Sequence, residues 1–148
     1  MSLKETINND IKTAMKAKDK ETLAVLRMIK TAIQAAEIDK KSDLTPEEEL
    51  TILSREAKQR RDSIVEFEKA GRQELVEKTQ GELAIVEKYL PAQLSIEEVQ
   101  AKIAEIAEQV GATTQKEFGK LMGAVMQALK GQADGNVIKE QVKAHLNK

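Results

Sequence analysis

The chain has 148 residues, of which 33% are charged and 41% are hydrophobic, and its formal net charge is −1. This hydrophobic content excludes a disordered chain, and no apolar run approaches the roughly 20 residues that cross a bilayer. With no cysteine, the chain has no disulfide, thiol nucleophile or thiolate metal site. The N-terminus carries acids as well as bases and is no signal peptide. We therefore expect a cytoplasmic protein without a cofactor.

The first half of the chain predicts three helices in succession. Ser2 and Glu5 have the spacing of a capping box, and Asp19 can cap a second helix that runs to about residue 38. The strongest start is Thr45-Pro46-Glu47-Glu48, which places an N-cap, a proline and a box glutamate in the preferred order. The three glutamates from residue 47 to 49 form a helical first turn, where acids complement the dipole, so we do not interpret them as a catalytic cluster.

A boundary follows the fourth helix. Apolar residues from 75 to 90 predict that helix, with Gly81 as a weak point, and Pro91 ends it. The segment YLPAQLS, residues 89–95, then combines a helix stop with a new cap at Ser95. Apolar residues predict three further helices, over residues 96–110, 114–129 and 137–146. The fold class is therefore all-α, with an N-terminal bundle of about four helices in residues 1–91 and a three-helix domain in residues 92–148.

No self-sufficient catalytic site is expected. His145 is the single histidine, near a helix C-terminus, where a cation is favoured. Without a second histidine or a cysteine, a histidine-rich zinc site and a Cys–His pair are excluded. Ser54 and Ser63 lie inside helical patterns that do not resemble a nucleophile elbow.

Arg60 and Arg61 interrupt an apolar helical series at a point where the pattern predicts an apolar residue. In one interpretation their stems cover the seam while the guanidiniums reach water or pair with Glu56 or Asp62. In the other they contact a phosphate or a partner, for which the planar fork of arginine is suited. Both interpretations stay open, and the pair is a second candidate binding patch.

Four of the seven glycines lie between residues 119 and 135. Gly119 and Gly123 are four apart, on one face of the predicted sixth helix, and each costs about 1 kcal/mol relative to alanine. The simplest compensation is the close approach of another backbone, either a neighbouring helix or an external ligand such as RNA. Gly131 is a helix stop, and Asp134-Gly135-Asn136 forms a turn that caps the last helix.

This part of the chain is also basic. Residues 112–148 contain six lysines against three acids. The lysines that surround the glycines are Lys116, Lys120, Lys130, Lys139 and Lys143. The only aromatic residues, Phe67, Tyr89 and Phe118, lie on apolar stripes, so base stacking is not expected to drive binding. A folded RNA recognised by its shape and phosphates suits such a surface better.

Two segments resemble a known family. FGKLMGAVMQALKGQADGNVIKEQVKAHL is similar to the C-terminal signature of the GatB/YqeY domain. RRDSIVEFEKAGRQELVEKTQGELAIVEKYLPAQLS resembles the N-terminal half of free-standing YqeY-like proteins. The positions that match the tail motif are Gly119, Lys120, Met122, Gly123, Lys130, Gly131, Ala133, Asp134 and Gly135.

The resemblance implies an all-helical fold and a tail similar to that of the B subunit of glutamyl-tRNA(Gln)/aspartyl-tRNA(Asn) amidotransferase. In that enzyme the tail contacts the outer corner of tRNA, and the family-level activity is that of a carbon–nitrogen ligase with glutamine as amido-N-donor. The catalytic body of the enzyme has no counterpart here, so we expect a tRNA-binding accessory protein that is not catalytic alone. The alternative is a helical adaptor that docks on an amidotransferase or another protein. Neither DNA nor a membrane is an expected partner.

Overall fold

The computed structural model describes residues 2–147. Within this range the chain forms seven α-helices, one 3-10 turn and no strand, which confirms the all-α prediction. The elements are α1 (Leu3–Ala17), α2 (Lys20–Lys40), α3 (Pro46–Lys69), α4 (Gln73–Glu87), α5 (Ile96–Val110), η1 (Gln115–Glu117), α6 (Phe118–Ala128) and α7 (Gly135–Leu146). They form two compact units, Met1–Leu90 and Pro91–Lys148. The boundary that we placed from the sequence, after residue 91, lies one residue further along the chain.

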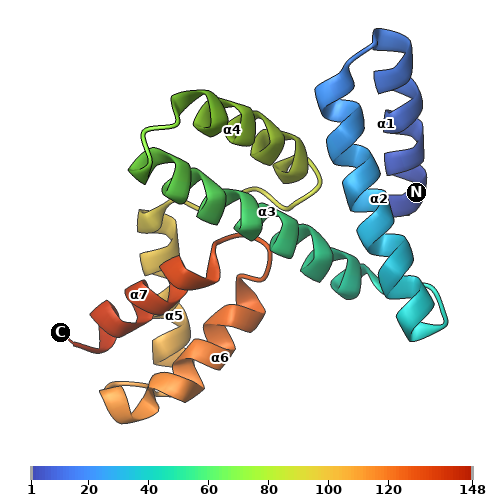
Figure 1. The fold of residues 1–148 in the computed structure, drawn as a ribbon. Coiled ribbons are helices and arrows are strands. Elements are labelled where there is room, and N and C mark those ends of the chain that lie inside the picture. Colours follow the sequence, from blue (N-terminus) through green and yellow to red (C-terminus); the bar gives the residue numbers. More distant parts are fainter. Residues whose placement is uncertain (1, 148) are drawn as a thin grey trace. The chain divides into compact units, whose positions relative to one another are not determined.

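The first unit consists of two helical hairpins. Helices α1 and α2 run side by side in opposite directions, as do α3 and α4, and α2 packs against both members of the second hairpin (Figure 1). The core contains β-branched and leucine side chains at helical spacing, which is why the stripes in the sequence predicted these helices. Its buried residues are Ile7, Ala14, Val25, Leu26, Ile29, Ile33, Ile52, Leu53, Ala57, Ile85 and Val86.

Helix starts follow the capping signals. The Thr45 hydroxyl accepts a hydrogen bond from the backbone N–H of Glu48 (3.2 Å), and the Glu48 carboxylate accepts one from the Thr45 N–H (2.9 Å). Ser95 and Glu98 make the same reciprocal pair at the start of α5. At α1 the structure shows one half of the predicted box, in which Ser2 accepts from the Glu5 N–H. These bonds satisfy N–H groups that the first helical turn leaves without partners.

The second unit is a three-helix arrangement in which α5, α6 and α7 each pack against the other two. The predicted sixth helix begins with the 3-10 turn η1, and regular α-helix starts only at Phe118. Its core is separate from that of the first unit. The buried residues are Val99, Ile103, Ile106, Ala107, Ala112, Leu121, Val125, Leu129, Ile138, Val142 and Leu146.

Several large apolar residues of the predicted helices are exposed, although helical periodicity predicts buried positions for them. Met15, Met28 and Ile96 are 54%, 52% and 52% exposed. Ile38, in the last turn of α2, is 74% exposed. Periodicity predicts which face of a helix is buried but not where that face ends, and these four residues lie beyond it. None of the helices within residues 2–147 has the length and apolarity needed to span a bilayer.

Candidate nucleic-acid interface

The outward face of α6 carries two glycines with nothing packed on them. Gly119 and Gly123 are both exposed, and a Cβ atom built on either would meet no other atom within 4 Å. Leu121 and Val125, which follow each glycine by two positions, are fully buried and hold the opposite face on the core. The internal neighbour that we considered from the sequence is therefore not there. The helix backbone is open to solvent along this face.

Lysines flank the open glycines. Lys116 in η1 and Lys120 in α6 are exposed, and Lys130, two residues beyond α6, is half-buried. Residues 118–133 contain no acid. We call Lys116, Gly119, Lys120, Gly123 and Lys130 the α6 face. It has positive charge near both ends and bare backbone between them.

Met126 lies beside the α6 face, although the apolar pattern of residues 114–129 predicts a buried position for it. It is 41% exposed, and its methyl group lies 3.6 Å from where a Cβ of Gly135 would be. Its spacing from Gly123, three residues, is the signal that would have placed it on the glycine face. A Cβ at position 135 would thus make an ordinary van der Waals contact with the Met126 methyl group where α7 begins.

The turn between α6 and α7 is held from within its own unit. Gly131, three residues beyond the end of α6, has φ of 79°, a left-handed conformation that favours glycine and turns the chain. Its carbonyl accepts a hydrogen bond from the Gln93 side chain (2.7 Å), and the carbonyl of Gln132 accepts one from the Leu94 N–H (2.8 Å). Asp134 caps α7 by accepting from the Asn136 N–H (2.7 Å). Gly131 and Asp134 thus shape the loop rather than present open groups.

The two remaining lysines of the candidate site lie on another helix. Lys139 and Lys143 are exposed, four residues apart on α7, and each follows a buried residue. They form a second pair of surface cations that is distinct in the chain from the α6 face. His145 is half-buried in the last turn of α7, as expected for a residue at a helix end.

Two of the three acids between residues 112 and 148 are used in helix caps, and the third, Glu140, is exposed on α7. The Glu117 carboxylate accepts hydrogen bonds from the backbone N–H groups of Thr113 (3.0 Å) and Thr114 (3.2 Å), which lower its pKa. Asp134 caps α7 as described above. These carboxylates are therefore committed to backbone donors beside the lysines, and the surface of α6 itself stays basic.

Arg60 does not belong to an accessible patch. Its side chain is 6% exposed, Nη1 lies 2.8 Å from the Glu56 carboxylate, and Nε lies 3.3 Å from Oε1 of Glu82. The Nε contact is an ion pair without hydrogen-bond geometry. A phosphate could not reach this buried and paired guanidinium. The interpretation of Arg60 as a contact for a phosphate or a partner is therefore corrected. Arg61, its neighbour, is half-buried.

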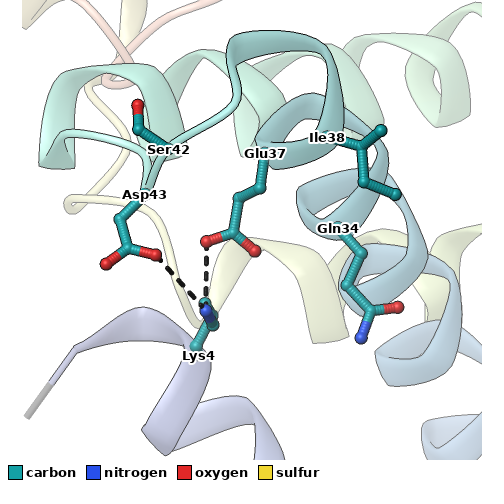
Figure 2. Close-up of a pocket in the computed structure, with 6 residues that line it drawn as sticks. All are labelled: Lys4, Gln34, Glu37, Ile38, Ser42 and Asp43. Atoms are coloured by element: carbon teal, nitrogen blue, oxygen red, sulfur yellow. Dashed lines mark hydrogen bonds and ion pairs between the residues drawn. The ribbon is translucent and has the colours of Figure 1, made fainter.

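A depression at the end of the α1–α2 hairpin is occupied by internal ion pairs. Figure 2 shows the Lys4 ammonium between two carboxylates, 3.0 Å from Glu37 and 3.9 Å from Asp43. The hydrogen bond to Glu37 raises the pKa of Lys4. The contacts join the start of α1 to the end of α2, so we interpret this feature as structural. Within residues 2–147, no group of three or more histidine or acidic side chains is placed to hold a metal ion.

The structure thus defines a two-unit helical protein whose C-terminal unit has an open, glycine-bearing basic helix face. The family model described as YqeY-like protein matches residues 4–146. The chain belongs to the YqeY-like family, and this confirms the resemblance seen in the sequence.

The curated relatives share a name. A Kluyveromyces lactis protein named "Altered inheritance of mitochondria protein 41, mitochondrial" is 38% identical over 68% of this chain and 56% of its own length. Proteins of the same name from Pyrenophora tritici-repentis and Saccharomyces cerevisiae are 31% and 30% identical, over 84% and 80% of this chain. The matches cover 69% and 68% of those proteins. The names place these relatives in mitochondria, whereas we expected a cytoplasmic protein from the sequence.

Proposed function

We propose that this protein is an RNA-binding accessory factor whose C-terminal unit docks on folded RNA through the α6 face. The first candidate is the outer corner of tRNA, by the resemblance of the tail. The open glycine pair carries the proposal. A glycine in a helix interior costs about 1 kcal/mol relative to alanine. Gly123 has such a position and Gly119 lies in the first turn of α6, and no packed neighbour accounts for either. An external backbone that approaches the thinned helix would account for both.

The charges on this face suit a phosphate backbone. Lys116 and Lys120 are exposed beside the glycines, and α6 contributes no carboxylate. Lysine ammonium groups gain affinity by releasing counterions from nucleic acid, while bare backbone N–H and Cα groups permit close contact. Because only a few lysines take part, affinity is modest and falls steeply with salt. Both the cytoplasm and the mitochondrion contain tRNA, so the proposal suits either compartment.

Catalysis is not part of the proposed role. The face presents lysine, glycine and methionine side chains, and the sequence has no cysteine and one histidine. We therefore propose that the chain does not transfer amide nitrogen by itself, and that any link to a carbon–nitrogen ligase is as an accessory. Amide transfer by the purified chain alone would overturn this part.

The glycines permit a test in which stability and binding change in opposite directions. Gly119→Ala/Gly123→Ala should raise the free energy of unfolding by about 1 kcal/mol, most of it from the interior position 123, because alanine is the better helix former. The same variant should weaken binding to total tRNA, measured by fluorescence anisotropy at two salt concentrations. Gly119→Gln/Gly123→Gln, with longer neutral side chains, should weaken it further.

Matched controls separate this site from general effects. Gln59→Ala removes an exposed side chain from α3 of the first unit and should leave tRNA affinity unchanged. Lys116→Glu/Lys120→Glu should abolish binding at moderate salt. Absence of tRNA binding by the wild type at low salt would refute the proposal. A protein partner that survives nuclease treatment and tolerates this charge reversal would favour the adaptor alternative.

A further inference from the structure

A second basic surface lies at the turn between α1 and α2, far in the sequence from the α6 face. Its residues, which we call the α1–α2 tip, are Lys12, Lys16, Lys18, Lys20 and Lys88. All five are exposed. Within the part of the chain that the structure describes, none of them forms an ion pair. Lys88, the residue after α4, is close enough to act electrostatically on Asp19 in the turn.

The acids beside these lysines are committed elsewhere. Asp19 is the single acid between residues 12 and 20, and its carboxylate accepts hydrogen bonds from the Thr22 N–H (3.1 Å) and hydroxyl (2.7 Å). Those bonds cap α2 and lower the pKa of Asp19. The Glu21 carboxylate is directed at Gly81 of α4, 2.6 Å from where a Cβ of that glycine would be. The tip has a net positive charge because its five lysines outnumber the neighbouring acids Asp19 and Glu21.

Helix electrostatics explain only part of this cluster. Lys16 lies in the last turn of α1, where the helix dipole favours a cation. Lys20, in contrast, is the first residue of α2, where the dipole disfavours one. Lys18 has φ of 57°, a left-handed backbone conformation that is less strained for glycine than for lysine. Local stability alone would not select these two lysines.

The opposite end of the hairpin is acidic. Residues 37–49 contain six acids and two lysines. Helix α2 has 21 residues and is thus about 31 Å long, several times the Debye length of about 8 Å at physiological salt. The acidic end therefore does not neutralise the tip. Charge is therefore distributed unevenly along α2, with the positive end well separated from the negative end.

We infer that the α1–α2 tip is a second phosphate-binding surface that contacts the backbone of the same folded RNA as the α6 face. The identity of the polyanion rests on the proposed function. The tip bears one large exposed apolar side chain, Met15, and a single unbranched thioether provides little insertion into a lipid bilayer. Three exposed lysines at the turn, with Lys12 one helical turn before it and Lys88 after α4, suit a line of phosphates instead. Two surfaces on one chain raise the effective concentration of each for a shared RNA.

The chain offers a matched pair of variants for the test. Lys18 and Lys41 are both lysines in a left-handed C-cap, with φ of 57° and 63°, at the basic and the acidic end of the hairpin. Replacement by glycine removes one charge and relieves the same conformation in both. Lys18→Gly should weaken binding of total tRNA two- to threefold at moderate salt, whereas Lys41→Gly should not weaken it.

Replacing three lysines of the tip at once measures how many RNA phosphates the tip contacts. Lys12→Ala/Lys16→Ala/Lys20→Ala should lower affinity at least tenfold and reduce the slope of log K against log salt by about 2, at roughly 0.7–0.9 per phosphate contact. Circular dichroism verifies that the exposed substitutions leave the fold intact. The same titrations with Lys116→Ala/Lys120→Ala report on the α6 face independently.

The outcomes distinguish the two proposals. If the tip variants bind as tightly as the wild type while the α6 variants bind weakly, the inference is wrong and the proposed function stands. If only the tip variants lose affinity, the tip binds RNA and the α6 face does not. Tip-dependent binding to phosphatidylserine vesicles without any binding to tRNA would also overturn the inference.

Discussion

The buried guanidinium of Arg60 on α3 lies against the carboxylate of Glu82 on α4, with Nε 3.3 Å from Oε1. The same side chain donates to the backbone carbonyl and the carboxylate of Glu56, and Nη2 lies 3.7 Å from the sulfur of Met28 on α2. One arginine thus joins three helices of the first unit. Two carboxylates depend on its charge.

Arg60→Ala should therefore lower the free energy of unfolding by about 3 kcal/mol, because it leaves Glu56 and Glu82 without their cation in a poorly solvated place. Urea denaturation measures the change. Arg55→Ala, at an exposed position on the same helix, should shift the midpoint very little. Equal midpoints for the two variants would show that the buried cluster contributes no specific stability.

The two lysine C-caps lead to a prediction on stability. Lys18→Gly and Lys41→Gly should each raise the free energy of unfolding by about 1 kcal/mol, because a side chain is strained at positive φ. Gly111→Ala should have the opposite effect, since Gly111 ends α5 with φ of 72°. Thermal melts of the three variants test the set, and a loss of stability in both lysine variants would contradict it.

Acid should weaken the start of α3. The hydrogen bonds from Lys40 and Thr45 lower the pKa of Glu48 from 4.5 to about 2. A depressed folded-state pKa means that this contribution is present above pH 4.5 and is lost as the pH falls toward 2. Glu48→Gln should therefore reduce the dependence of stability on pH in this window, measured by urea unfolding at several pH values. An unchanged pH profile would show that other carboxylates dominate.

Alkali should act on the contact between Tyr89 and Asp10. The phenol donates a hydrogen bond to the Asp10 carboxylate, and burial together with this carboxylate raises the pKa of Tyr89. A raised folded-state pKa means that the contact stabilises the fold at neutral pH and is lost only well above pH 10. Tyr89 is the only tyrosine and there is no tryptophan, so ultraviolet absorbance reports its ionisation directly.

Asp10→Asn should lower the pH at which tyrosinate forms, because the negative charge that disfavours it is gone. The control is Asp62→Asn, a change of the same kind at an exposed position on α3. A titration curve of Asp10→Asn that superimposes on that of the wild type would contradict the prediction.

Local signals in the sequence predicted the helices well. The caps at Thr45 and Ser95 are formed by residues three positions apart, so their chemistry is visible in a short window, and the structure confirms both. The left-handed stop at Gly131 is local in the same sense. Residue spacing also placed Gly119 and Gly123 on one face of a helix.

Features that join distant segments could not be predicted. The partner of Arg60 across the hairpin, Glu82, is 22 residues away in the sequence, and no periodicity relates the two. Likewise, the sequence could not decide whether a neighbour covers Gly119 and Gly123, because that depends on how α5 and α7 pack. Burial at the edge of an apolar stripe, as at Met126, could not be predicted for the same reason.

The two hydrogen bonds between residues 93–94 and the turn after α6 determine where the C-terminal unit can be separated from the rest of the chain. A fragment that begins at Ser95 would contain every helix of the unit and both members of its first capping box. It would nevertheless lack the Gln93 amide and the Leu94 N–H, the donors that hold the carbonyls of Gly131 and Gln132. Dissection of the protein should therefore cut before Pro91, so that this short extended stretch stays with the helices whose last loop it fastens.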